Sequence, residues 1–235
     1  MKTTIPGFYP IHDVGVSCHL LVEGNQCVLI DTGLTPVVRF VLKRRMRLLG
    51  LPPGALKAIF LTHGHLDHTC NLDWIQRWSG APVYVHREDD LHVAGKFPYR
   101  GANRICGWLE ALGRAVFRYR APALLHFFED GEMLPFQCGL RVVQLPGHTH
   151  GHCGFFSGKK NLLFSGDLFA CYLLITHTPM AFLNSCQEKM ASSFRTVAEM
   201  NPRYIVCNHY QFFDPAQIRR NFQKLYEKSF VPQPI

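Results

Sequence analysis

Five short β-type runs in this sequence each end in residues that can bind a metal ion. The runs at 27–30, 58–61, 140–145, 161–164 and 204–207 lead into Asp31, 63–68, His148, Asp167 and His209, respectively. Residues that follow neighbouring strands of an α/β sheet converge at one edge, even when they are far apart in the sequence. The sequence therefore predicts a sheet edge that gathers all five groups in one site.

Helix-like stretches alternate with the β-type runs, so we expect an α/β fold. Further β-type runs occupy 14–22, 82–85 and 153–156, and helical patterns occupy 36–49, 71–78, 102–119, 187–200 and 214–227. Residues 157–160 form a hairpin connection, which indicates that part of the sheet structure is antiparallel. Asp214 is expected to cap the last helix, with Pro215 in its first turn.

One domain is the economical division of the 235 residues, because no repeat, low-complexity tract or Ser/Pro/Gly linker interrupts them. We expect a single domain over 1–235 with a helical insertion at about 91–126. A hydrophobic content of 47% against 18% charged residues excludes a mainly disordered chain.

The chain shows no feature of a membrane or secreted protein. Its apolar runs fall far short of the roughly 20 residues of a membrane-spanning helix, and the N-terminus lacks the zones of a secretory signal. Nine cysteines without tight CxxC spacing indicate buried free thiols rather than a disulfide framework. We expect a cytoplasmic protein without membrane insertion, and the sequence does not predict its oligomeric state.

The residues at the strand ends have the chemistry of a metal site. They provide five imidazoles and two carboxylates, at His63, His65, His68, His148, His209, Asp67 and Asp167. Zinc binds imidazole nitrogen and carboxylate oxygen, and a catalytic zinc keeps one position for water. Seven ligands suit two ions about 3.5–4 Å apart, with three histidines at one, two histidines and Asp67 at the other, and one oxygen of Asp167 to each.

These motifs resemble the five ordered motifs of the metallo-β-lactamase superfamily, over nearly the whole chain. The resemblance implies an αββα sandwich of two mixed β-sheets flanked by helices, with a dinuclear site at the sheet edges. It also implies a first metal bound by His63, His65 and His148, a second bound by Asp67, His68 and His209, Asp167 as the bridge, and Asp31 as a residue that orients a ligand histidine.

Within the superfamily, residues 145–152 and 206–210 are most similar to the glyoxalase II branch of thioester hydrolases. The glycines that usually follow the His-x-His-x-Asp-His motif are replaced here by Cys70 and Asn71. A reduced glyoxalase-like hydrolase and a relative of the acyl-homoserine lactonases both stay open. Cys70 is expected to be a buried thiol, and His150 and His152 are expected to form hydrogen bonds or to face the substrate rather than bind metal.

We therefore expect a metal-dependent hydrolase in which metal-bound hydroxide attacks a thioester, ester or lactone carbonyl, with Asp67 and Asp167 as the catalytic carboxylates. Two zinc ions are expected, and iron or manganese would also fit these ligands. The alternatives are a phosphodiesterase or nuclease, which the net charge of +8 would suit, a persulfide dioxygenase with one iron, and a non-catalytic metal-binding member. Because nuclease-type motifs are missing, a small molecule is favoured over nucleic acid.

Four residues are candidates for substrate binding. Tyr172 and Tyr210 follow ligands closely and could donate a hydrogen bond to a substrate oxygen. In the helical insertion, the residues expected to form a buried stripe are Ile105, Trp108, Leu109, Leu112 and Val116. Arg114 and Arg118 lie on a different face, where they could recognise an anionic group of the substrate; a solvated helix face is the alternative.

Overall fold

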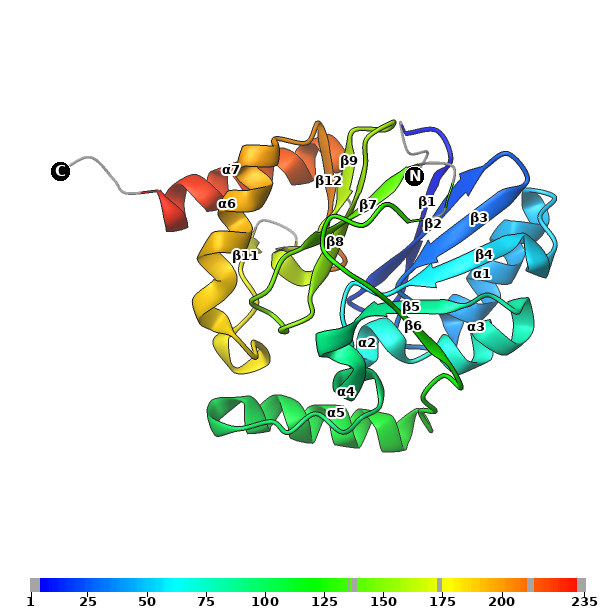
Figure 1. Cartoon of the computed structure of the whole chain (residues 1–235), viewed down its shortest axis with the longest axis horizontal. Coiled ribbons are helices and arrows are strands. Elements are labelled where there is room, and N and C mark those ends of the chain that lie inside the picture. Colours follow the sequence, from blue (N-terminus) through cyan, green and yellow to red (C-terminus); the bar gives the residue numbers. More distant parts are fainter. Residues whose placement is uncertain (1–4, 135, 137–138, 173–174, 211–213, 232–235) are drawn as a thin grey trace.

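Two mixed β-sheets, packed face to face between helices, form the centre of the fold (Figure 1). The computed structural model describes residues 5–134, 136, 139–172, 175–210 and 214–231. In it, α1 and α3 cover one side of the sandwich and α6 and α7 the other (Figure 1). The expected αββα sandwich is confirmed.

The first sheet combines antiparallel and parallel strands. Its order is β1 (Phe8–His12), β2 (Ser17–Glu23), β3 (Gln26–Ile30), β4 (Leu56–Phe60), β5 (Val83–His86) and β6 (Leu125–Phe128). The strands are antiparallel from β1 to β3 and parallel from β3 to β6. The outer face packs on α1 (Val37–Leu48) and α3 (Leu72–Ser79). In α1 the buried residues recur every four positions, at Val38, Leu42 and Met46, which gives the helix one apolar side.

The second sheet carries the other expected ligands. Its order is β12 (Tyr204–Val206), β9 (Leu162–Phe164), β8 (Cys153–Ser157) and β7 (Leu140–Gln144), with β12 and β9 parallel. It packs on α6 (Met190–Met200) and α7 (Pro215–Phe230). As predicted, Asp214 caps α7, because its side chain accepts hydrogen bonds from the Ala216 and Gln217 amides.

Phenylalanines join the inner faces of the two sheets. The rings of Phe60 and Phe128, from the first sheet, lie 5.7 and 5.6 Å from Phe155 of the second. At the other side of the core, Phe8 meets Phe164 edge to face at 5.6 Å. Aromatic packing of this kind adds to the apolar burial that holds two sheets together.

Four strands lie outside the runs read from the sequence: β1, β6, β10 (Ala170–Tyr172) and β11 (Ile175–His177). β1 contains Pro10, which lacks an amide donor, yet it forms because it lies at the edge of its sheet. The expected strand at 14–22 begins only at Ser17, because Gly15, with φ of +74°, lies in the turn that precedes it.

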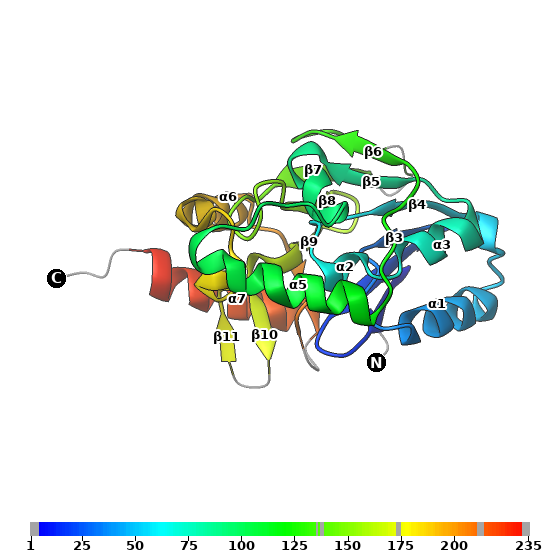
Figure 2. The ribbon, with the colours of Figure 1, turned by 90° about the horizontal axis from the view of Figure 1, so that it is seen from below.

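The expectation of a buried apolar stripe in the helical insertion is wrong. Between β5 and β6 lie α4 (Asp90–Val93) and α5 (Arg104–Val116), and α5 crosses the front of the molecule in Figure 2. The five residues of the expected stripe are all between 49% and 69% exposed. The other side of α5 packs on α2 (Leu66–Thr69), where the Glu110 carboxylate accepts a hydrogen bond from the Leu66 amide at 2.9 Å. The polar side faces inward because it finds partners there.

No helix among the described residues has the length and apolar character needed to cross a bilayer.

A buried carboxylate, Asp89, ties the two sheets together beside the expected ligands. It lies in a 3-10 turn after β5 and is fully buried. One oxygen accepts hydrogen bonds from the Gly64 amide (2.7 Å) and the Thr149 hydroxyl (2.8 Å), and the other from the Gly151 amide (2.9 Å). Burial raises the pKa of Asp89 to about 6. The loop after β4 and the loop between β7 and β8 are therefore held by one side chain.

We expect Asp89→Asn to lower the free energy of unfolding by about 2–3 kcal/mol, because an amide cannot accept all three bonds and turns an N–H toward another donor. Urea unfolding at pH 7.5 measures the change. Asp90→Asn is the matched control, since the half-buried Asp90 carboxylate takes none of these bonds. Equal losses in the two variants would show that Asp89 does not act as a clamp.

Candidate metal centre

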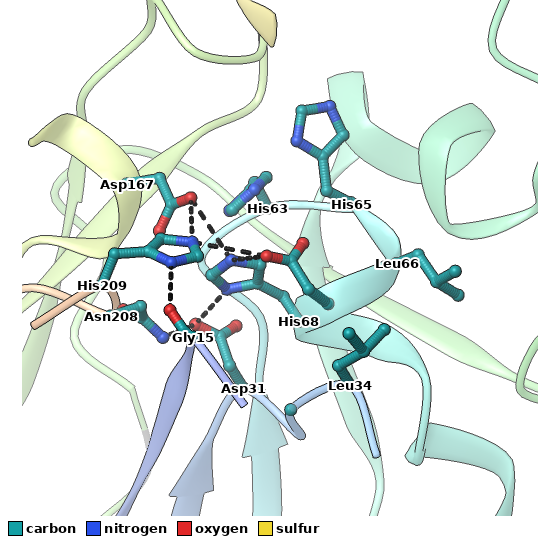
Figure 3. A network of polar contacts seen from close by, with 12 residues as sticks. Gly15, Asp31, Leu34, His63, His65, Leu66, His68, Asp167, Asn208 and His209 are labelled. Carbon is teal, nitrogen blue, oxygen red and sulfur yellow. Dashed lines mark hydrogen bonds and ion pairs between the residues drawn. The ribbon is translucent and has the colours of Figure 1, made fainter. Parts of the chain in front are cut away.

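The side chains that follow the strands lie together at one edge of the sandwich (Figure 3). Asp31 follows β3 and His63 follows β4, and these strands are parallel neighbours. Asp167 and His209 follow β9 and β12, the parallel pair of the second sheet. Parallel neighbours end at the same edge, which brings the four residues to one place.

The first group of ligand atoms comes from His63, His65 and His148, which are buried and lie within 4.8 Å of one another. His65 Nδ1 is 2.9 Å from His148 Nε2, so both nitrogens face the same point. Burial lowers the pKa of His65 to about 4, that of His148 to about 3 and that of His63 well below its ordinary value. The three imidazoles are neutral at pH 7 and have lone pairs for a metal ion.

The second group consists of Asp67, His68, Asp167 and His209, again within 4.8 Å. His209 Nε2 lies 2.9 Å from Asp167 Oδ2 and 3.3 Å from Asp67 Oδ2. Burial opposes charge on these groups, but Asp167 and Asp67 raise the pKa of His68 and His209 well above the usual range. His68 and His209 in turn hold the pKa of both carboxyls well below theirs. Without metal, two protons balance the two carboxylates.

Asp167 connects the two groups. Its Oδ2 lies 3.4 Å from His68 Nε2 in the second group and 3.6 Å from His148 Nε2 in the first. Its Oδ1 is buried and has no hydrogen-bond partner among the described residues. This carboxylate is therefore placed to contact a cation in either group.

Three buried atoms of the cluster make no hydrogen bond in the described part of the chain: His63 Nε2, Asp167 Oδ1 and His68 Nε2, which has only ion-pair contacts with carboxylates. Buried polar atoms are normally hydrogen-bonded, so two nitrogens and a carboxylate oxygen that make no hydrogen bond on one centre favour a bound cation, which would replace the proton on His68. Imidazole and carboxylate ligands suit zinc, iron and manganese. The residues present fit two divalent ions.

Asp31 orients His68 and His63 through their outer ring nitrogens, on the side away from the cluster. Its carboxylate accepts hydrogen bonds from His68 Nδ1 (3.1 Å), the Thr62 hydroxyl (2.8 Å) and Asn208 Nδ2 (2.7 Å). The Thr62 oxygen, having donated to Asp31, is 3.1 Å from His63 Nδ1 and accepts from it. Asp31 adopts the left-handed conformation, with φ of +59°, which these bonds stabilise. Both ring protons are thereby placed away from the cluster.

His152 positions Asp167, which is the hydrogen-bonding role expected for it. Its Nδ1 donates to the Leu145 carbonyl at 2.8 Å, so its Nε2 accepts from the Asp167 amide at 2.9 Å. Burial lowers the pKa of His152 to about 4, which keeps it neutral for this purpose. Gly166, with φ of +55°, leaves room for the contact, because a Cβ there would lie 2.5 Å from His152 Nε2.

Sequence reasoning missed Thr62, Asn184 and Asp89. Asn184 Oδ1 accepts a hydrogen bond from His148 Nδ1 at 2.8 Å, but it lies in a loop with no strand-end signal. Thr62 directly precedes the first ligand and Asp89 comes soon after β5, so position at the same sheet edge could have indicated both.

Of the two tyrosines proposed for substrate binding, Tyr172 forms hydrogen bonds within the chain and Tyr210 is buried. The Tyr172 hydroxyl lies 2.5 Å from both His209 Nδ1 and the Gly15 carbonyl, behind the ligand histidine. His209 Nδ1 also donates to the Gly15 carbonyl at 2.6 Å. Tyr210 is 8% exposed and belongs to the core between the sheets.

The two arginines proposed for substrate binding lie outside both ligand groups. The Arg114 guanidinium pairs with Glu110 at 2.9 Å, donates to the His92 carbonyl at 2.8 Å and stacks on Tyr119. Arg118 is exposed, just beyond the end of α5. Cys70 also lies outside the groups, and burial raises the pKa of its thiol to about 11.

A cavity of about 410 Å³ lies next to Asn184. Asn184, which binds the outer nitrogen of His148, lines it together with Arg100, Asn103, His150 and Ser185. The cavity thus combines a ligand-supporting amide with a cationic and an imidazole side chain.

Comparison with known proteins agrees with this architecture. Residues 12–209 match the family model described as the metallo-beta-lactamase superfamily. "Probable metallo-hydrolase YflN" of Bacillus subtilis is 29% identical over 203 residues, covering 80% of this chain and 76% of that protein. "Hydroxyacylglutathione hydrolase GloC" of Haemophilus influenzae is 31% identical over 120 residues, covering 48% and 50%.

Solved structures share the fold. A "metallo-beta-lactamase family protein", TTHA1429 from Thermus thermophilus, superposes with a TM-score of 0.74 at 24% identity, over 95% of this chain and 79% of that one. TTHA1623, solved in a "di-iron-bound form", gives a TM-score of 0.68 at 21% identity, over 96% and 98%. With the family model spanning most of the chain and the paired ligand groups in place, this protein belongs to the metallo-β-lactamase superfamily.

Proposed function

We propose that this protein is a dinuclear metal-dependent hydrolase that cleaves a thioester, ester or lactone bond of a small molecule. The observation that carries the proposal is the position of Asp167 Oδ2 within 3.6 Å of histidine nitrogens from both ligand groups. The hydrolase names of the relatives and the di-iron form of one structural neighbour support it. Zinc is the expected metal, with iron or manganese as substitutes.

Two divalent ions, when bound, would supply an activated water and polarise the carbonyl that it attacks. The chain's own residues prepare that arrangement. Asp31, Asn184 and the Gly15 carbonyl hold outer ring nitrogens, so the inner nitrogens need no reorientation. His152 fixes the backbone that carries Asp167. Fixed ligands cost little reorganisation when charge develops in the transition state.

The open side of the cluster is marked by Asp67. Its side chain is 32% exposed, whereas that of Asp167 is 7% exposed and that of His68 is fully buried. A substrate would therefore approach from the Asp67 side, and the cavity lined by Asn184, whose amide binds His148, is a separate space that would receive one of its groups. Arg100 and His150 in that cavity suit a carboxylate or another anionic group.

Metal analysis joined to a substrate panel tests the proposed function. We expect two divalent ions per chain after reconstitution with excess zinc, and turnover of at least one thioester, ester or lactone. A bis-aryl phosphodiester is the contrasting substrate. One ion at saturation, or activity confined to the phosphodiester, would contradict the proposal.

Asp167→Asn is expected to reduce kcat by about 10²–10⁴-fold, because an amide cannot bridge two cations as a carboxylate does. The measurement is steady-state kinetics with parallel metal analysis and circular dichroism. Cys70→Ser is the matched control: it removes a buried potential ligand near the cluster and should leave both ions bound. Loss of an ion from Cys70→Ser but not from Asp167→Asn would make the ligand assignment wrong.

Arg100→Gln should raise KM for an anionic thioester about tenfold, with little effect on a neutral ester, because a charge-assisted contact is lost only for the anion. Arg118→Gln serves as the control and also tests the sequence-based proposal for the insertion. Paired KM measurements on the two substrates decide between them. A charge-dependent effect in Arg118→Gln alone would place anion recognition at the end of α5 instead of in the cavity.

A further inference from the structure

The outer side of α5 is an exposed apolar surface, which we call the α5 apolar face. It consists of Ile105, Trp108, Leu109, Leu112 and Val116, which are 49%, 69%, 56%, 65% and 66% exposed. At 100° per residue they span an arc of about 100° on the helix. Isolated exposed apolar residues are ordinary, but a continuous stripe with a tryptophan indicates an interaction surface.

The helix cannot bury this face by turning, because its opposite side is fixed by polar contacts. Glu110 accepts from the Leu66 amide and pairs with Arg114, whose guanidinium also donates to the His92 carbonyl. Gly113 packs so closely that a Cβ there would lie 2.5 Å from the Leu66 side chain. The polar and small residues of α5 are held against the rest of the protein by these contacts. The α5 apolar face therefore points to solvent.

Basic residues flank the α5 apolar face in the sequence. Five exposed cations lie in the same segment: Lys96, Arg100, Arg104, Arg118 and Arg120. Within 91–126 the sequence has one acid, Glu110, and Arg114 already neutralises it. An apolar stripe with a tryptophan and flanking arginines is the composition of helices that lie in the interface of a membrane. Anionic lipid headgroups are the complementary charge.

From this geometry we propose that α5 docks on an anionic phospholipid surface, with its axis in the plane of the bilayer and its apolar face among the acyl chains. A second copy of the chain fits less well. A two-fold interface places the same patch on both subunits, so five cations would meet five cations without acids between them. Docking through α5 involves no substrate, so a test of vesicle binding can fail or succeed whether or not the protein hydrolyses the proposed substrates.

Vesicle binding by the full, metal-loaded chain tests the proposal. We expect the protein to sediment with vesicles of phosphatidylcholine and phosphatidylserine, to bind pure phosphatidylcholine weakly and to dissociate as salt rises. Leu109→Ser with Leu112→Ser should reduce binding about tenfold or more. The matched control is Val37→Ser with Leu48→Ser on α1, whose side chains are 55% and 67% exposed.

Charge is tested in the same way. Arg104→Gln with Arg118→Gln should reduce binding to the mixed vesicles. Lys224→Gln with Lys228→Gln should not, because α7 lies at the upper edge of the molecule in Figure 1 and α5 at the lower edge. Fluorescence of Trp108 should shift to the blue on binding, and Trp108→Phe should remove most of that shift while binding persists.

Three outcomes would overturn the proposal. The first is that neither kind of vesicle binds, or that both bind equally well. The second is that the α1 variants lose as much binding as the α5 variants. The third is a dimer in light scattering that Leu109→Ser with Leu112→Ser dissociates, which would make a second copy the occupant. Circular dichroism and urea unfolding establish that each variant is folded.

Discussion

The structure depends on a buried concentration of charge at the edge of two sheets. Two carboxylates and five imidazoles share a space in which every ligand atom has a neighbour within 4.8 Å in its group. Such a cluster is tolerable only when each proton has a defined place or a cation replaces it. The pKa values follow this requirement: those in the first histidine group are lowered by burial, whereas His68 and His209 are raised by the carboxylates.

Residues around the cluster form hydrogen bonds with the outer ring nitrogens of four of its histidines: His63, His68, His148 and His209. Asp31 accepts a hydrogen bond from His68 directly and orients His63 through the Thr62 hydroxyl, while Asn184 accepts a hydrogen bond from His148. Because these partners accept hydrogen bonds from the outer ring nitrogens, the inner nitrogens of His63 and His148 have free lone pairs, and that of His68 is the atom that would exchange its proton for a cation. The fold contributes by joining loops from both sheets, and the buried Asp89 is the side chain that links them.

That these side chains lie together could be predicted from the sequence, because each group of them follows a strand and parallel strands end at a common edge. The αββα architecture came from the family resemblance that those ligands carry. Asn184 could not be read in this way, since its position depends on the path of a loop after β11. The Tyr210 side chain shows another limit: closeness to a ligand in sequence does not decide direction, and its ring lies in the core.

Helical periodicity shows that α5 has an apolar side but not which way that side points. The side that faces the protein is set by contacts with the segment that carries His65 and Leu66. Glu110 accepts a hydrogen bond from the Leu66 amide, and Cys106 Sγ lies 3.9 Å from His65 Nε2. A leucine or tryptophan in place of Glu110 would leave that buried amide without an acceptor, which costs more than exposing an apolar side chain. The support that α5 gives to the metal-binding loop therefore requires a polar inner side, and its apolar residues remain outside, available to another surface.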